Sequence, residues 1–201
     1  EKHGEHRVFD APLAEGGIAA IAFGMGLNGL RPVAEIQFAD YIFPAYDQIV
    51  NEIAKLRHRS GGEFSTPVTI RTPAGGGIKG GHHHSQSPES QFTHTPGLKV
   101  VYCSNPNNAK GLLTSAIECN DPVIFFEPKR CYRGPFYGDP HNVPTWKNHP
   151  KGEVPEGYYS IPLEQAEVVR EGDACTVIAW GAMVHVCEQA INDSGINAEL
   201  I

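Results

Sequence analysis

Three stretches of the sequence place acidic, amide, phenol and imidazole side chains at the ends of apolar runs. Glu15 stands before a segment, residues 16–30, that contains no charged residue. Gln37 and Tyr41 lie at the end of a second apolar run, and His84 closes a row of three histidines in the third stretch. Such groups accept, donate or share protons with a bound molecule. Because α/β folds build their sites at strand ends, these residues are the first candidates for a site.

Glu15 is the acid on which we place most weight. It lies at the mouth of the uncharged segment, where a carboxylate favours the first turn of any helix. It can equally be a partly buried acid with a chemical role. The residues alone leave both interpretations open.

The row His82, His83, His84 follows a glycine-rich loop, residues 75–81, and such loops let the backbone approach a ligand closely. Three adjacent imidazoles cannot easily share one tetrahedral zinc ion, because successive side chains of an extended chain point to opposite sides. We therefore expect one histidine to lie in a cleft as a proton donor. A solvated surface loop is the alternative.

Gly24, Gly26 and Gly29 match the G-x-G-x-x-G pattern of dinucleotide-binding folds. The pattern has this meaning only where it follows a strand and opens a helix. Here the glycines close an apolar segment and precede a strand-like run. We expect close helix packing and a turn instead of a nucleotide site.

The alternation of helical and strand-like patterns predicts an α/β fold, with a mostly parallel sheet and helices on both faces. Residues 16–30 predict a closely packed helix, and residues 32–38 predict a strand. The next helix should start with Asp40 as its N-cap, run to about Arg59 and end at residues 60–62. The other expected elements are strands at residues 68–72, 99–103 and 123–126 and a helix after Asn105.

A second unit is expected near the end of the chain. Residues 128–162 are rich in proline, glycine and aromatic residues and predict a long connector. Residues 174–180 and the stretch up to about Ser194 predict the first strand and helix of a second α/β domain. The sequence starts without methionine and ends in a strand-like run at Ile201, so we expect a fragment or a truncated gene product.

Charge and cysteine usage limit the class of partner. The chain has 16 basic and 23 acidic residues without a cluster of Lys or Arg, which argues against a nucleic-acid partner. No apolar run approaches the roughly 20 residues of a membrane span, and no signal-peptide pattern opens the chain. Five cysteines without a C-x-x-C pair favour a reducing compartment. We expect a soluble protein with a small-molecule or protein partner.

Four motifs resemble the beta subunits of thiamine-dependent 2-oxo acid dehydrogenases, in their branched-chain version. The motifs cover residues 12–18, 35–48, 84–89 and 121–128, and the resemblance extends from about Arg7 to Ile201. It implies a transketolase-like fold in which residues 1–128 form the pyrimidine-binding domain, residues 129–162 a connector, and residues 163–201 the beginning of a C-terminal domain.

The resemblance also implies a cofactor site. In this family the first domain binds the aminopyrimidine half of thiamine diphosphate. By similarity, Glu15 would hydrogen-bond the ring nitrogen, Leu13, Gln37 and Tyr41 would line the ring's pocket, and His84 would face the reacting carbon. Glu15 and His84 would be the catalytic residues of oxidative decarboxylation.

The resemblance further implies a structural potassium ion that is held mostly by backbone carbonyl groups. The residues of this site would be Val68, Thr69, Ala116, Cys119 and Asp121. A plain helix end is the alternative interpretation of these residues.

The magnesium motif of the family, Gly-Asp-Gly with a later Asn-Asn, is absent from the sequence. Magnesium would therefore come through an alpha subunit, with two alpha and two beta subunits in a heterotetramer that is active only when assembled. The resemblance implies a 2-oxo acid substrate and a lipoyl acyltransferase component as partner. The compartment would be the bacterial cytoplasm or the mitochondrial matrix.

Three alternatives remain. A pyruvate dehydrogenase beta subunit differs only in substrate, and a transketolase-like synthase differs in reaction. A non-catalytic α/β binding or assembly module would keep the fold and lose the cofactor.

Overall fold

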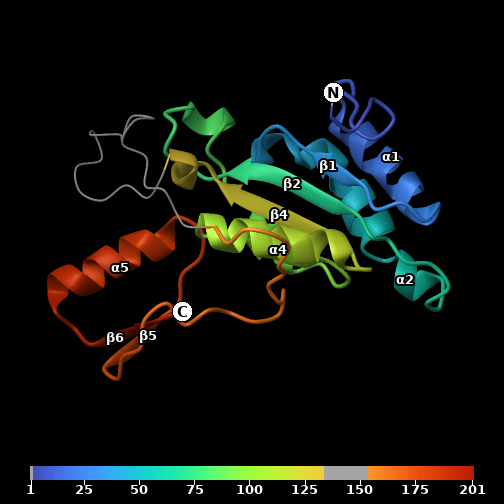
Figure 1. Ribbon diagram of the computed structural model, residues 1–201. Helices are drawn as coiled ribbons and strands as arrows, with labels where there is room; N and C mark the ends of the chain where they lie inside the picture. The colour runs from blue at the N-terminus through green and yellow to red at the C-terminus, as the bar shows by residue number, and fades with distance from the viewer. Residues whose placement is uncertain (1, 134–153) are drawn as a thin grey trace.

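A parallel four-stranded sheet organises the chain up to Pro128 (Figure 1). The computed structural model describes residues 2–133 and 154–201. The strands β1 (Val33–Glu35), β2 (Thr69–Ala74), β3 (Lys99–Tyr102) and β4 (Val123–Pro128) lie in the order β1-β2-β4-β3, with every neighbouring pair parallel. The predicted α/β fold with a mostly parallel sheet is confirmed.

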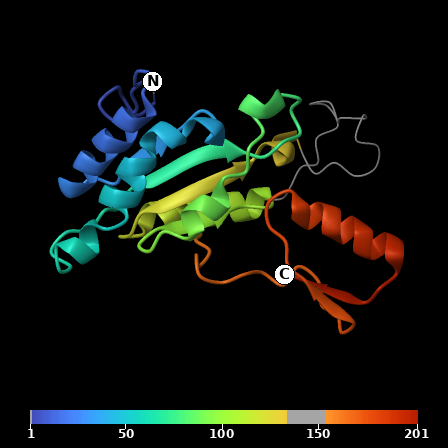
Figure 2. The same ribbon diagram turned by 180° about the vertical axis from the view of Figure 1, so that it is seen from behind.

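Strand β4 lies between β2 and β3 and is buried along its whole length. Its side chains alternate between two apolar clusters. Ile124 and Phe126 pack on the side of helix α1 (Glu15–Leu27), and Val123 and Phe125 pack on the side of α4 (Pro106–Glu118). Figures 1 and 2 show the helices on the two faces of the sheet. A strand covered on both faces is apolar at every position, which made it recognisable in the sequence.

Helix α1 follows the prediction closely. Its small residues allow it to approach the sheet, since a β-carbon on Gly26 would lie 3.2 Å from Cγ2 of Val68. Gly29 follows the helix with a left-handed φ of +82°. The glycine pattern thus provides close packing and a turn, as predicted.

The segment between β1 and β2 differs from the single helix that was predicted. It consists of short turns, namely the 3-10 helices η1 (Ala39–Tyr41) and η2 (Phe43–Ala45), the π-helix η3 (Gln48–Ile53) and the α-helix α2 (Leu56–Arg59). Pro44 has no N–H group and interrupts the backbone hydrogen bonds early in the segment. The predicted N-cap is wrong, because Asp40 lies inside η1 and its carboxylate accepts hydrogen bonds from a distant loop.

The predicted strand and helix of a second unit are both present. Strands β5 (Cys175–Val177) and β6 (Ala198–Leu200) form a separate parallel pair, with α5 (Met183–Ser194) between them in sequence. Residues 134–153 of the predicted connector lie outside the described residues. None of the helices in the described ranges is long and apolar enough to cross a membrane.

Candidate functional site

The structure brings Tyr41 and His84 together and adds Phe38 to them. Tyr41 ends η1, and His84 directly follows the short helix η4 (Gly81–His83). The Tyr41 hydroxyl lies 3.2 Å from Nδ1 of His84. The Phe38 ring stacks on the imidazole, with centroids 4.2 Å apart and an interplanar angle of 8°. His84 is half-buried, and its contacts with Phe38 and Tyr41 orient the ring.

The carbonyl group of His83 decides which nitrogen of the His84 imidazole carries the proton. Its oxygen lies 2.6 Å from Nδ1, and a carbonyl can only accept a hydrogen bond. We therefore assign the hydrogen to Nδ1, which leaves the lone pair of the neutral ring on Nε2. Nε2 has no hydrogen-bond partner among the described residues. It can take a proton from a bound molecule and return it.

Two buried charged residues hold the loop around His84, and the sequence analysis gave neither of them a role in a site. Asp40 accepts hydrogen bonds from the backbone N–H groups of Ser85 and Gln86, both at 3.2 Å. Lys129, in the 3-10 helix η5 (Lys129–Arg133), donates to the carbonyl oxygen of His84. The only signal for Lys129 is its place directly after the apolar strand β4, at the edge of the sheet where sites form.

Glu15 is the first residue of α1 and is half-buried. Its carboxylate has no hydrogen bond or ion pair with any residue that the structure describes. The start of α1 packs on η2, since a β-carbon on Gly16 would lie 3.1 Å from the Pro44 carbonyl oxygen. Because η2 follows η1 directly, Glu15 and the Tyr41 turn belong to the same packed region.

Leu13 and Gln37 are both exposed, and 81% of the Leu13 surface is open to solvent. In the described part of the chain, no hydrogen bond joins Gln37 to Tyr41 or His84. Of the predicted site residues, Tyr41 and His84 are therefore in direct contact. Leu13 and Gln37 have side chains that are exposed to solvent.

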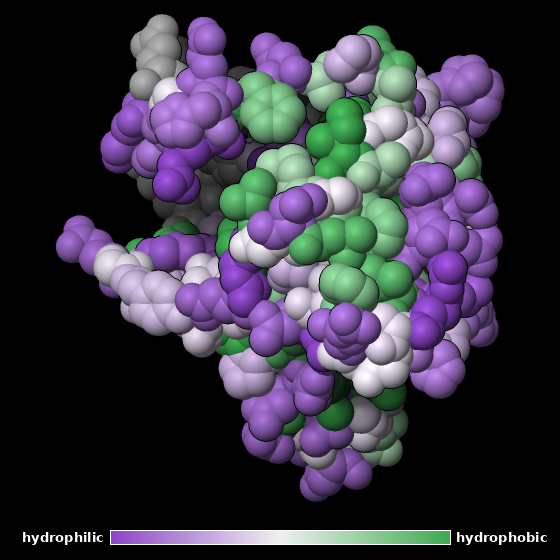
Figure 3. All heavy atoms as spheres, turned by 90° about the vertical axis from the view of Figure 1, so that its right-hand side faces the viewer, coloured by the Kyte–Doolittle hydropathy of each residue, from purple (hydrophilic) through white to green (hydrophobic). Residues whose placement is uncertain are grey.

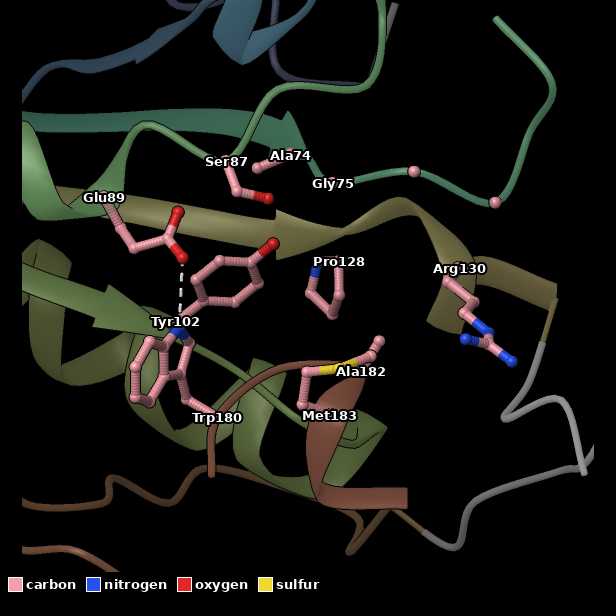
Figure 4. A pocket seen from close by; sticks show the side chains of 12 residues that line it. Ala74, Gly75, Ser87, Glu89, Tyr102, Pro128, Arg130, Trp180, Ala182 and Met183 are labelled. Carbon is pink, nitrogen blue, oxygen red and sulfur yellow. Dashed lines mark hydrogen bonds between the residues drawn. The ribbon is translucent and has the colours of Figure 1, made fainter. Parts of the chain in front are cut away.

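A cavity of about 440 Å³ lies at the carboxyl ends of β2, β3 and β4 (Figure 4). Tyr102, Trp180 and Met183 provide apolar walls, and Glu89, the first residue of α3 (Glu89–Thr93), accepts a hydrogen bond from Trp180 Nε1 at 3.1 Å. Burial, together with the Glu89 carboxylate, raises the pKa of the Tyr102 phenol. None of the site residues predicted from sequence is among the described residues that line this cavity.

An ion-pair network ties three strands together near η5. Arg71 on β2 donates to both carboxylate oxygens of Glu127 on β4, from Nε at 2.6 Å and from Nη2 at 2.9 Å. Its Nη1 contacts Glu35 on β1 at 3.1 Å. The hydrogen bond from Arg71 to Glu127 raises the pKa of the guanidinium. Tyr132 also donates to Glu127, which anchors the turn that carries Lys129.

Two arginine side chains bind oxygen atoms of the predicted potassium site at the end of α4. Arg31 Nη1 donates to the Cys119 carbonyl oxygen at 2.9 Å, and also to the carbonyl oxygens of the two preceding residues. Arg57 Nε lies 2.6 Å from Oδ1 of Asp121. A cation bound there would have to share these oxygens with both arginines.

Comparison with known proteins identifies the family. The family described as "Transketolase, pyrimidine binding domain" matches residues 1–135. The 2-oxoisovalerate dehydrogenase subunit beta of Pseudomonas aeruginosa is 55% identical over 100% of this chain and 58% of its own length. The mitochondrial protein of that name from Dictyostelium discoideum is 53% identical over 100% of this chain and 52% of its own. The pyruvate dehydrogenase E1 component subunit beta of Acholeplasma laidlawii is 46% identical, with 100% and 58% covered.

A solved structure supports the fold. The chain titled "Split gene transketolase, inactive beta4 tetramer" superimposes with a TM-score of 0.70 at 20% identity, over 99% of this chain and 57% of that one. The present chain thus spans little more than half the length of the relatives that it matches. Since the match to the family extends over residues 1–135 of 201, the chain belongs to the transketolase pyrimidine-binding domain family.

Proposed function

We propose that this chain is part of the beta subunit of a branched-chain 2-oxo acid dehydrogenase. The reaction is the oxidative decarboxylation of 2-oxo acids, with transfer of the acyl group to a lipoyl carrier. The observation that carries the proposal is the orientation of His84 by Phe38 and Tyr41, with no partner for Nε2 among the residues that the structure describes. The chain is also similar along its full length to relatives of that name.

The residues fit the aminopyrimidine half of thiamine diphosphate. The half-buried Glu15 carboxylate has no partner among the described residues, which suits a group that shares a proton with a ring nitrogen. The exposed Leu13 offers an apolar surface to an aromatic ring. When bound, thiamine diphosphate supplies the electron sink for loss of CO₂.

The chain's own residues then have separate tasks. Glu15 orients the pyrimidine ring and holds a proton against its nitrogen. Gln37 and Tyr41 limit the position of the ring. His84 gives or takes a proton through Nε2 during acyl transfer, since a ring nitrogen of imidazole can accept and donate a proton. The stacked Phe38 keeps the imidazole plane fixed while this happens.

The surface around α1 has the apolar character of a protein–protein contact. Apolar side chains gather on this face of the molecule (Figure 3). Ile21 on α1 and Leu30 after it are both 53% exposed. Contiguous exposed apolar surface usually marks a contact with another chain. We assign this face to the alpha subunit, which would also supply magnesium in an assembly of two alpha and two beta subunits.

The remaining assignments belong to the same proposal. Residues 1–128 form the pyrimidine-binding domain, residues 129–162 the connector and residues 163–201 the start of a C-terminal domain. The lipoyl acyltransferase component is the second protein partner, and the compartment is a bacterial cytoplasm or a mitochondrial matrix.

A potassium ion at the end of α4 would raise the melting temperature of the protein in potassium buffer compared with sodium buffer.

Reconstitution tests the function. The full-length subunit is combined with its alpha subunit, and decarboxylation of 2-oxoisovalerate and of pyruvate is followed with an artificial electron acceptor. We expect a higher kcat/KM for 2-oxoisovalerate. Preference for pyruvate would support the second candidate, which the similarity to the Acholeplasma laidlawii protein favours. Absence of both thiamine diphosphate binding and turnover would support the non-catalytic module.

A further inference from the structure

Two buried charged side chains from other segments, Lys129 in η5 and Asp40 in η1, contact the loop that carries His84. Lys129 is 4% exposed and Asp40 is 9% exposed. Burying a charge is unfavourable unless hydrogen bonds and opposite charges compensate for it, so such residues are rare in protein cores. Burial lowers the pKa of the Lys129 ammonium, and the nearby Asp40 carboxylate acts in the opposite direction.

Lys129 contacts the His84 loop in two ways. Its ammonium donates a hydrogen bond to the carbonyl oxygen of His84. It also lies over the Phe38 ring, 4.9 Å from the centroid, in a cation–π contact. The same Phe38 ring stacks on the imidazole of His84, with centroids 4.2 Å apart. One ammonium therefore fixes both the backbone of His84 and the ring on which its side chain rests.

Asp40 holds the next two residues of the same loop. Its Oδ1 accepts from the N–H groups of Ser85 and Gln86, while Oδ2 is buried without a partner among the described residues. The His84 carbonyl and the two N–H groups that follow it are thus bound by side chains of opposite charge. Hydrogen bonds to ionised groups are about twice as strong as neutral ones, so the loop has little freedom to rotate.

We propose that Lys129 and Asp40 are positioning residues that hold the imidazole of His84 in the orientation required for acyl transfer. The proposal rests on the proposed function, because it assumes that His84 acts in that step. Methionine at position 129 has no hydrogen-bond donor and would leave the His84 carbonyl without the one that Lys129 supplies. A small displacement of a reacting group, on the order of 1 Å, can lower the rate by about 100-fold.

Lys110 provides a matched control. Its ammonium also donates to a carbonyl oxygen, that of Pro155 at 2.6 Å, and lies over an aromatic ring, that of Tyr159, at 4.8 Å from the centroid. Lys110 lies on α4, and neither of these partners belongs to the His84 loop. Lys110→Met therefore removes the same kinds of contact without reaching His84.

The experiment uses the full-length subunit assembled with its alpha subunit. Turnover is measured with an artificial acceptor and with the lipoyl domain for Lys129→Met, Lys129→Arg, Lys110→Met, His84→Ala and the double variant Lys129→Met with His84→Ala. Lys129→Met should lower lipoyl-dependent turnover by about 10- to 100-fold and acceptor-dependent turnover by less, with Lys129→Arg in part restored. Lys110→Met should change neither assay.

The double variant separates positioning from mere folding. In the His84→Ala background, Lys129→Met should cost less than about twofold, because it acts only through the imidazole. Full additivity of the two losses, or equal losses in both assays with weakened cofactor binding, would overturn the proposal. If Lys129→Met does not fold, the same cycle is run with Asp40→Asn, which keeps the volume and one acceptor.

The experiment distinguishes failure of the proposed function from failure of the positioning role. If His84→Ala leaves lipoyl-dependent turnover intact, the role of His84 in the proposed function falls and this inference falls with it. If His84→Ala is impaired while Lys129→Met, or Asp40→Asn in its place, behaves like Lys110→Met, the function stands and the positioning role is wrong.

Discussion

Replacing Glu127 by Gln should destabilise the protein measurably, because it removes one charge from the network that joins three strands. Glu127 binds Arg71 through two hydrogen bonds of 2.6 and 2.9 Å, and their side chains are 10% and 34% exposed respectively. Leaving one partner of a buried ion pair unpaired costs about 3–5 kcal/mol. Arg71 is partly solvated and keeps its contact with Glu35 at 3.1 Å, which reduces the expected loss to about 2 kcal/mol.

Urea unfolding of the full-length subunit measures this loss. With a slope of about 2 kcal/mol/M, a loss of about 2 kcal/mol lowers the midpoint by about 1 M. Glu52→Gln is the matched control, because Glu52 pairs with Arg59 at 2.9 Å with side chains 37% and 54% exposed. A surface pair contributes at most about 1 kcal/mol, so the control midpoint should hardly move. Equal shifts in the two variants would refute the reasoning that burial makes the Glu127 pair strong.

Four further predictions concern the site and the assembly. Glu15→Gln should preserve assembly but lower decarboxylation by roughly 100-fold, as expected for a lost acid–base group, and near-normal turnover would remove Glu15 from the mechanism. His84→Ala should impair the lipoyl-dependent assay more than the artificial-acceptor assay while His82→Ala is mild, and a more sensitive His82 would contradict the assignment. Tyr41→Ala should weaken thiamine diphosphate binding, measured by titration calorimetry, more than it lowers the melting temperature of the cofactor-free protein; the reverse order would indicate a purely structural role. Ile21→Glu should shift the size-exclusion profile from the heterotetramer towards free subunits, and an unchanged profile would exclude this face of α1 from the interface.

Features that depend only on residues close together in the chain could be predicted from the sequence. The apolar run Val123 to Phe126 predicted a strand, and residues 16–30 predicted a closely packed helix, since burial on several sides demands apolar or small residues at each position. The motifs around Glu15, Gln37 and His84 indicated the family, which comparison with known proteins then confirmed. Local composition and short motifs determined this much without knowledge of the fold.

Contacts between distant residues were decided only by the tertiary structure. Asp40 obeys the local rule for an N-cap, but its carboxylate meets two N–H groups 45 and 46 residues away, and these outweigh the nearby helix start. The contacts of Lys129 could not be predicted from the sequence, because its partners are a backbone carbonyl, which every residue has, and the ring of Phe38. The tautomer of His84 follows from the His83 carbonyl, whose direction depends on how the loop folds back. The sequence specifies which side chains are present. Their hydrogen-bond and packing partners depend on which strands and loops lie next to one another at the edge of the folded sheet.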